Sequence, residues 1–138
     1  MTLSHSENET QDIAKEVSKK IASGGLVCLF GDLGTGKTTF TKGLAENLGI
    51  EKFTVKSPTY TYMRDHKLKN GHKLYHIDLY RLNGVDELLL EEIQEIINNP
   101  HNLVVIEWAD RLDEYLPKER INIIFKYISD TEREITVQ

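Results

Sequence analysis

The sequence has 138 residues, with 17 basic and 22 acidic side chains that leave a formal net charge of -5. This length fits one domain of ordinary size, so we expect a single domain over residues 1–138 and no second catalytic domain. The acidic balance excludes a broad electrostatic footprint for nucleic acid or for an anionic membrane surface.

The N-terminal composition and the cysteine content bear on the cellular compartment. Residues 1–10 are polar and acidic, without the charged and apolar regions of a signal peptide. No apolar run approaches the ~18 residues that span a membrane, so we expect a cytoplasmic protein with no membrane partner. The single cysteine, Cys28, excludes an internal disulfide and lies in an apolar stretch, which predicts a buried, inert thiol.

The first predicted element is an amphipathic helix over residues 8–22. Its apolar side chains recur at every fourth position, at Ile13, Val17 and Ile21. Ser6 together with Glu9, or Thr10 alone, is suited to cap the N-terminus of this helix. The segment Ser23-Gly24-Gly25 ends the helix and leads into the next element.

A P-loop pattern follows, with the flanking elements that it requires. Residues 31–38 read Gly-Asp-Leu-Gly-Thr-Gly-Lys-Thr and match G-x-x-x-x-G-K-[ST]. An apolar strand over residues 26–30 precedes the loop, and residues 39–48 have helical spacing. Glycines allow backbone N–H groups to turn inward at a helix N-terminus, which cradles a polyphosphate. Lys37 would then reach the β- and γ-phosphates, and the Thr38 hydroxyl would ligate Mg²⁺.

The second half of the chain predicts a mixture of strands and helices. Asn70-Gly71 is a turn signal that pairs residues 60–66 with residues 73–79 in a hairpin. The other expected elements are a helix over 86–98, an apolar strand over 103–106, a short helical segment over 108–116, and hairpin strands over 121–127 and 133–137. Together these indicate an α/β, P-loop NTPase-like three-layer domain, with a central mixed, mostly parallel sheet and antiparallel hairpins.

Two carboxylates follow predicted strands and are candidates for the metal and for hydrolysis. Glu107 directly follows the apolar strand in the manner of a Walker-B acid, and Asp78 also lies at a strand end. Either could hold Mg²⁺, and the sequence does not decide between them. His76 is expected to hydrogen-bond Asp78, because Mg²⁺ prefers oxygen ligands. Thr59 is a candidate for a loop that senses the γ-phosphate.

Four motifs, taken in chain order, resemble the bacterial TsaE (YjeE) family, the small ATPase of the tRNA threonylcarbamoyladenosine pathway. They are Gly-Asp-Leu-Gly-Thr-Gly-Lys-Thr-Thr-Phe at 31–40, Ser-Pro-Thr-Tyr at 57–60, His-Ile-Asp-Leu-Tyr-Arg-Leu at 76–82 and Ile-Glu-Trp-Ala-Asp at 106–110. The last three motifs are far more specific than a P-loop by itself, and the four span most of the chain.

This resemblance implies a set of site residues and partners. ATP would contact Gly31, Asp32, Leu33, Gly34, Thr35, Gly36, Lys37, Thr38 and Thr39. Mg²⁺ would be held by Thr38 and Glu107, with Asp78 supporting hydrolysis. Thr59 and Trp108 would lie beside the nucleotide, with base or ribose contacts near Thr10 and Arg133. The partner would be a TsaB–TsaD heterodimer, in which TsaD modifies adenosine 37 of tRNA, so that tRNA is met only through that complex.

Three other functions compete with this interpretation. A small P-loop kinase or phosphotransferase would need an arginine-rich lid and an acceptor pocket, and the sequence offers neither. A Ras-like GTPase is disfavoured because the chain has no Asn-Lys-x-Asp segment. An interaction module that binds ATP without depending on hydrolysis is compatible with every motif.

Overall fold

We analysed a computed structural model, which describes residues 2–31, 36–50, 63–68, 71–80 and 86–138. The strands in these ranges are β1 (Thr2–Ser4), β2 (Gly25–Phe30), β3 (Met63–Lys67), β4 (Lys73–Asp78), β5 (Leu103–Glu107), β6 (Ile121–Tyr127) and β7 (Arg133–Val137). The helices are α1 (Glu7–Lys20), α2 (Lys37–Asn47) and α3 (Glu87–Asn98), with short 3-10 helices η1 (Ala109–Arg111) and η2 (Asp113–Tyr115). None of these helices is long and apolar enough to cross a membrane.

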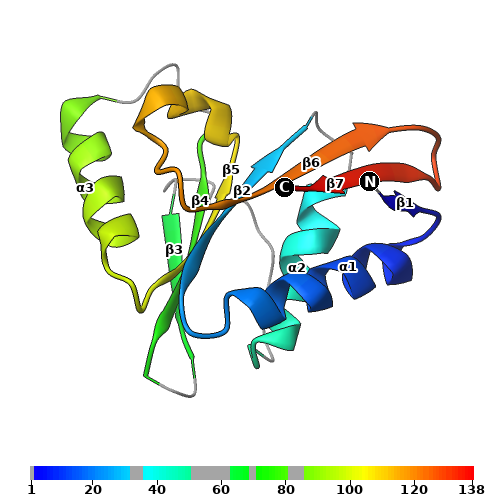
Figure 1. Cartoon of the computed structure of the whole chain (residues 1–138), viewed down its shortest axis with the longest axis horizontal. Coiled ribbons are helices and arrows are strands. Elements are labelled where there is room, and N and C mark those ends of the chain that lie inside the picture. Colours follow the sequence, from blue (N-terminus) through cyan, green and yellow to red (C-terminus); the bar gives the residue numbers. More distant parts are fainter. Residues whose placement is uncertain (1, 32–35, 51–62, 69–70, 81–85) are drawn as a thin grey trace.

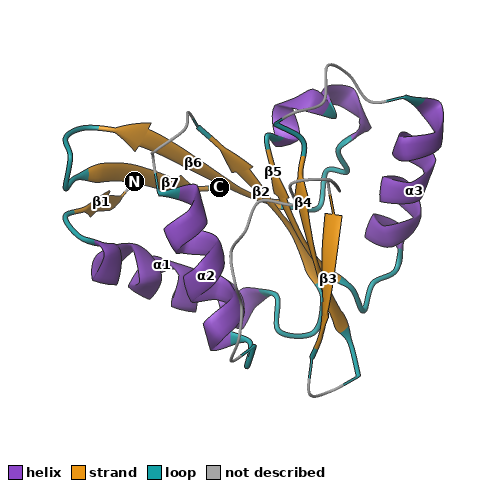
Figure 2. Ribbon diagram, turned by 180° about the vertical axis from the view of Figure 1, so that it is seen from behind, coloured by secondary structure: helices purple, strands orange, loops and turns teal. Residues whose placement is uncertain are grey.

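The described strands form one mixed sheet with the order β1-β7-β6-β2-β5-β4-β3. β6, β2, β5 and β4 are parallel neighbours in its centre, while β3 at one edge and β7 and β1 at the other pair antiparallel. α1 and α2 cover one face and α3 covers the other (Figures 1 and 2). This confirms the predicted α/β class with a parallel centre and antiparallel hairpins.

Alternating side chains of β2 divide the core between the two faces of the sheet. Val27 and Leu29 pack with residues of α1 and α2, whereas Leu26 and Cys28 pack with residues of α3. Both faces of β2 and β5 are therefore buried, as their continuous apolar runs predict. Cys28 is completely buried, as predicted, and burial raises the pKa of its thiol to about 12, which disfavours the reactive thiolate.

Helix α1 lies close against α2, and a side-chain cap fixes the start of α1. A Cβ at Gly43 of α2 would meet Ala14 Cβ of α1 at 3.3 Å, so the small side chains permit this approach. Ser6 caps α1 by accepting a hydrogen bond from Glu9 N at 3.2 Å. Glu9 in turn accepts from His5 N at 2.6 Å. The cap predicted from Ser6 and Glu9 is thereby confirmed, with the helix beginning at Glu7.

The structure differs from the sequence-based elements in three places. β1 was not predicted, because residues 2–4 are too short and too polar to give a strand signal. α2 begins at Lys37, two residues before the predicted start, since Gly36 adopts the left-handed conformation just ahead of it. The expected helical segment over 108–116 consists of η1 and η2, each a single turn.

Candidate functional site

The two described ends of the P-loop pattern, Gly31 and Gly36, directly follow β2 and directly precede α2, the neighbouring elements labelled in Figure 1. Gly36 has φ +98 and serves as the N-cap of α2 without a side-chain cap hydrogen bond. Four predicted phosphate-binding residues, Asp32, Leu33, Gly34 and Thr35, lie outside the described residues. Of the loop, the structure describes Gly31 and Gly36 at its two ends.

Lys37 is buried, although lysines are seldom buried without a partner. Its Nζ donates a hydrogen bond to the carbonyl oxygen of Gly31 at 2.6 Å, across the two ends of the P-loop. The same ammonium lies 4.2 Å from the centroid of the Trp108 ring, within cation–π range. Thr38 in the first turn of α2 is exposed, and Thr39 is half-buried. The charge of Lys37 is therefore held at the start of the helix.

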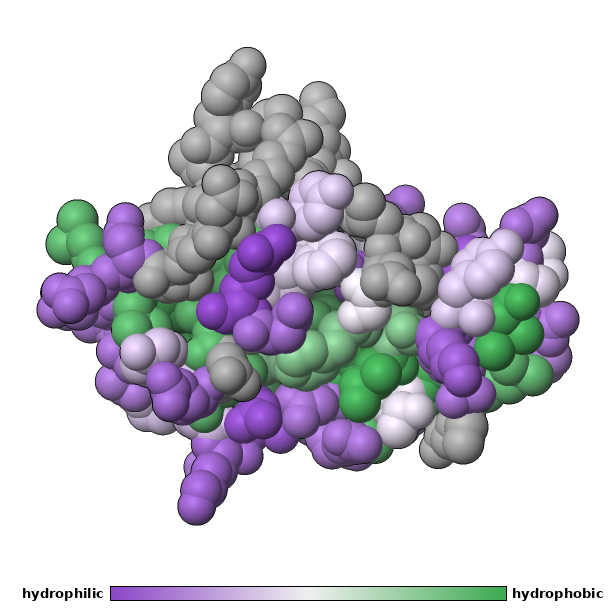
Figure 3. Space-filling model, turned by 90° about the horizontal axis from the view of Figure 1, so that it is seen from above, coloured by the Kyte–Doolittle hydropathy of each residue, from purple (hydrophilic) through white to green (hydrophobic). Residues whose placement is uncertain are grey.

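The two candidate carboxylates lie side by side at the ends of parallel strands. Asp78 of β4 and Glu107 of β5 are Cα partners, and Glu107 is also the partner of Leu29 in β2. Neighbouring strands lie about 4.8 Å apart, so the two acids and the start of the P-loop share one edge of the sheet. Glu107 is buried, while Asp78 is half-buried and accepts from Tyr80 N at 3.0 Å. Figure 3 shows the molecule from above the view of Figure 1, and both hydrophilic and hydrophobic residues appear on the face that it presents.

The buried partner of Glu107 is His76. His76 Nε2 lies 2.6 Å from Glu107 Oε2, and both side chains are almost fully buried. The sequence-based expectation that His76 hydrogen-bonds Asp78 missed this contact. His76 and Asp78 are two residues apart and share a face of β4, but Glu107 reaches the imidazole from the adjacent strand. His76 thereby restricts the position of one oxygen of Glu107.

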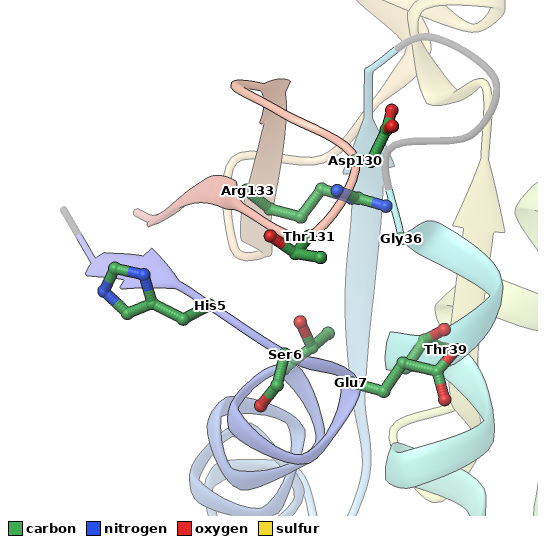
Figure 4. A pocket seen from close by; sticks show the side chains of 9 residues that line it. His5, Ser6, Glu7, Gly36, Thr39, Asp130, Thr131 and Arg133 are labelled. Carbon is green, nitrogen blue, oxygen red and sulfur yellow. The ribbon is translucent and has the colours of Figure 1, made fainter.

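A pocket of about 380 Å³ lies between the start of α1, the start of α2 and the β6–β7 turn. Figure 4 shows Ser6 and Glu7 across the pocket from Gly36 and Thr39, with Arg133 directed toward Gly36. Its lining residues are His5, Ser6, Glu7, Thr10, Gly36, Thr39, Asp130, Thr131 and Arg133. The volume lies within the range of small-molecule sites. The structure thus brings Thr10 and Arg133 together beside the helix that follows the P-loop.

Comparison with known proteins identifies the family. The family model described as "Threonylcarbamoyl adenosine biosynthesis protein TsaE" matches residues 4–135. The chain belongs to the TsaE family. A protein named "tRNA threonylcarbamoyladenosine biosynthesis protein TsaE" from Bacillus subtilis is 42% identical, over 93% of this chain and 78% of its own length. The protein of the same name from Streptomyces coelicolor is 36% identical, over 91% of this chain and 84% of its own.

The fold of this TsaE family member is also that of a solved structure. The crystal structure of Bacillus subtilis YdiB superimposes with a TM-score of 0.74 at 37% sequence identity. The superposition covers 99% of this chain and 82% of that chain. The mixed sheet and its helices are therefore the arrangement found in a relative of known structure.

Trp108 occupies an unusual backbone conformation between Glu107 and the first 3-10 turn. Its φ of +58 lies in the left-handed region, which is strained for a residue with a large side chain. The Tyr80 ring lies 5.1 Å from the Trp108 ring, and Arg111 Nη2 donates to Tyr80 O at 3.2 Å. These contacts hold Trp108 against Lys37, which places the predicted residue beside the P-loop of this TsaE family chain.

Several residues that lie at the candidate site were not predicted, and a further predicted residue lies outside the described residues. Ser4, which contacts Thr10, comes from the strand that the sequence does not reveal. Asp130 and Thr131 line the pocket, although the sequence placed them only between the two predicted hairpin strands. Thr59 falls in the range that the structure does not describe. Within the described ranges, no group of three or more His, Cys, Asp or Glu side chains is placed to hold a metal ion.

Proposed function

We propose that this chain binds Mg-ATP at residues 31–39 and hydrolyses the nucleotide. The observation that carries the proposal is the register of Asp78 with Glu107 beside the strand that leads into the P-loop. Phosphoryl transfer to water requires stabilisation of negative charge, ligands for a metal ion and a group that orients the water. A phosphate-binding loop next to two carboxylates at strand ends can provide all three. Asp78, Glu107 and the start of the P-loop lie at the carboxyl ends of parallel strands, which is where ligands bind in sheets of this kind.

The residues have distinct roles in this proposal. Lys37 stabilises negative charge on the phosphates, and its ammonium is already held near the loop by the Gly31 carbonyl. Mg²⁺ would be held by the Thr38 hydroxyl with Glu107 or Asp78, all of which offer the oxygen donors that this ion prefers. These oxygen donors are of the kind that Mg²⁺ binds, and the remaining ligands would be phosphate oxygens and water. One of the two carboxylates then orients the attacking water.

We further propose that hydrolysis supports threonylcarbamoylation of adenosine 37 in tRNA by a TsaB–TsaD-type heterodimer. Support comes from the family description and from the relatives, whose names refer to tRNA threonylcarbamoyladenosine biosynthesis. In this proposal residues 1–138 act as one ATPase domain, and tRNA is contacted only through the heterodimer. The net charge of -5 agrees with this indirect contact, because direct binding of the tRNA backbone favours a basic surface.

The proposal is tested by measuring ATP turnover with and without a TsaB–TsaD pair, together with tRNA threonylcarbamoylation over several turnovers. We expect weak turnover by the chain alone and stimulation by the pair. Lys37→Ala should lose nucleotide binding and turnover, whereas Glu107→Ala should retain ATP binding and lose turnover by about 100-fold or more. The single Trp108, 4.2 Å from Lys37, provides a fluorescence signal for binding in the same samples.

Different outcomes separate this function from its alternatives. A matched control is Lys42→Ala, because Lys42 is an exposed lysine one turn further along α2 and should leave both measurements unchanged. Full multi-turnover modification by Glu107→Ala would favour an interaction module in which ATP binding alone matters. Phosphorylation of an added hydroxyl compound would instead favour a kinase. Absence of nucleotide binding in the parent chain would rule out all three.

A further inference from the structure

The end of β4 and the segment after β5 are joined by three contacts beside the candidate carboxylates. Leu79 N donates a hydrogen bond to the carbonyl oxygen of Glu107 at 3.2 Å, directly after the last residue pair of the two strands. Arg111 Nη2 donates to the carbonyl oxygen of Tyr80 at 3.2 Å. The Tyr80 ring packs on the Trp108 ring, with their centroids 5.1 Å apart. Tyr80 is therefore held from the β5 side through both its main chain and its ring.

The carboxylate of Asp78 holds the main chain of Tyr80 from the other side. Asp78 Oδ1 accepts a hydrogen bond from Tyr80 N at 3.0 Å, which is the contact of an Asx turn at the end of β4. A candidate acid and the ring that packs on Trp108 are thus linked by one hydrogen bond. The donor belongs to the main chain, so a substitution of the Tyr80 side chain removes the ring and keeps the donor of this turn.

Trp108 depends on its neighbours because its backbone is strained. Its φ of 58 and ψ of 42 lie in the left-handed region, and a bulky residue keeps such a conformation only where surrounding contacts hold it. Arg111 N donates to the carbonyl oxygen of Trp108 at 3.1 Å, and the half-buried Trp108 ring packs on Tyr80. Loss of the Tyr80 ring therefore removes one of the contacts that keep Trp108 in place.

Trp108 in turn contacts the ammonium group of the P-loop lysine. Lys37 Nζ lies 4.2 Å from the centroid of the Trp108 ring, and Lys37 is only 4% exposed. An aromatic ring attracts a cation without carrying a net charge of its own. The contact therefore stabilises the buried ammonium and leaves its positive charge intact for a phosphate, whereas a carboxylate at the same place would cancel that charge.

We propose that Tyr80 is a positioning residue, whose ring holds Trp108 against Lys37 and so keeps the ammonium where it meets the phosphates of a nucleotide. This inference rests on the proposed binding of Mg-ATP at the P-loop. Tyr80 acts through Trp108 and not by touching the nucleotide. Because Tyr80 is 41% exposed, its ring contributes little to the core, and its substitution should affect the site more than the fold.

The test measures the dissociation constant of the full chain for Mg-AMPPNP, an ATP analogue that is not hydrolysed, by titration calorimetry. We expect Tyr80→Ala to weaken binding about 5- to 10-fold, the loss expected for a desolvated cation–π contact. Tyr80→Phe keeps the ring and should restore the affinity. The fluorescence emission of Trp108, the single tryptophan, should move to longer wavelength in Tyr80→Ala, because its ring then meets more water.

A double-mutant cycle shows whether Tyr80 acts through Trp108. Trp108→Leu should weaken binding at least as much as Tyr80→Ala, and the addition of Tyr80→Ala to Trp108→Leu should cause no further loss. Tyr115→Ala is a matched control, because Tyr115 of η2 is a 51% exposed tyrosine whose ring is not paired with Trp108 in the described part of the chain. This control should change neither the affinity nor the emission.

The possible results distinguish the inference from the proposed function. An unchanged affinity in Tyr80→Ala would overturn the inference and leave nucleotide binding intact. Equal losses from Tyr80→Ala in the parent and in Trp108→Leu would overturn the path through Trp108. A parent chain that does not bind Mg-AMPPNP would refute the nucleotide site and this role with it. If Tyr80→Ala does not fold, Tyr80→Leu takes its place, since it keeps an apolar side chain without a ring, and the parent affinity in Tyr80→Leu would overturn the inference.

Discussion

At the scale of single residues, the candidate site depends on contacts that hold two of its charged side chains in place. Lys37 is held between Gly31 and Trp108, and Glu107 is held by His76. Such contacts restrict each group to one position before a ligand arrives, which reduces the ordering that binding would require. The buried His76–Glu107 contact is the more demanding of the two, because a buried carboxylate oxygen without a partner is costly.

We predict that His76→Phe lowers ATP turnover by about 10- to 100-fold, the range typical for partners of metal-site ligands. The reason is that Glu107 Oε2 loses a contact of 2.6 Å, so the carboxylate no longer keeps the position needed to hold the metal or orient water. Nucleotide affinity should fall by much less, since Lys37 and the P-loop are unchanged. Steady-state kinetics with a separate binding titration measures the two effects.

Two further variants show whether His76 acts through Glu107. His76→Gln keeps a donor on a side chain of similar reach and should recover part of the turnover. His101→Gln is the control, because His101 is exposed and precedes β5, at the end opposite to Glu107. A wild-type turnover rate in His76→Phe, with the fold retained, would contradict a positioning role.

At the scale of secondary structure, the elements that the sequence predicted are those that local chemistry determines. The apolar runs of β2 and β5 indicated strands buried on both faces, and the cap of α3 at Asp86 was included in its predicted start. β1 was not predictable, because three residues gain their strand conformation only by pairing with β7. The His76–Glu107 contact depends on the order of β4 and β5, which periodicity does not reveal.

In the candidate site, too, the sequence predicted the features that depend on local residues and not those that depend on long-range contacts. The P-loop and Glu107 were recognisable because each motif is short and follows a clear apolar strand. The pocket was recognisable only as two separate residues, Thr10 and Arg133, whose proximity arises from the sheet order that sets β7 beside the start of α1. Ser4 had no signal at all, since a single serine near the N-terminus is ordinary in composition. Long-range contacts, therefore, account for what the sequence did not predict.

We predict that Asp86→Ala lowers the free energy of unfolding by about 1 kcal/mol, the usual effect of losing an N-cap. Asp86 Oδ1 accepts a hydrogen bond from Leu89 N at 2.8 Å. Its negative charge also interacts favourably with the positive, N-terminal end of the helix dipole. Urea unfolding followed by circular dichroism measures the change. Asp86→Asn keeps the acceptor and should lose only a few tenths of a kcal/mol. An equal loss in both variants would contradict capping by the side chain.

At the scale of the whole molecule, the central strand joins the binding site to global stability. β2 pairs with β5 on one side and β6 on the other, and it leads directly into the P-loop. Its residue Cys28 is fully buried on the face covered by α3. A local opening cannot expose a strand that is paired on both sides and covered on both faces, so Cys28 becomes accessible when the molecule unfolds.

We predict that a thiol reagent at pH 8 labels Cys28 at least about a thousandfold more slowly in the native chain than in urea. A free energy of unfolding of about 5 kcal/mol, the lower end of the range for natural domains, sets this factor, provided that refolding outpaces labelling. Burial contributes in the same direction, since the thiolate is the reactive form and the pKa of the native thiol is raised from 9.0 to about 12. Absorbance of the released reagent group gives both rates.

Binding at the P-loop should slow this reaction further, because a ligand that binds only the folded chain lowers the population of the unfolded one. At a Mg-ATP concentration of 100 times the dissociation constant, the labelling rate should fall about 100-fold. Lys37→Ala should abolish this protection while keeping slow labelling, which separates ligand binding from the burial of Cys28. Rapid labelling of the native parent, with or without nucleotide, would show instead that β2 opens locally and that the sheet is not one cooperative unit.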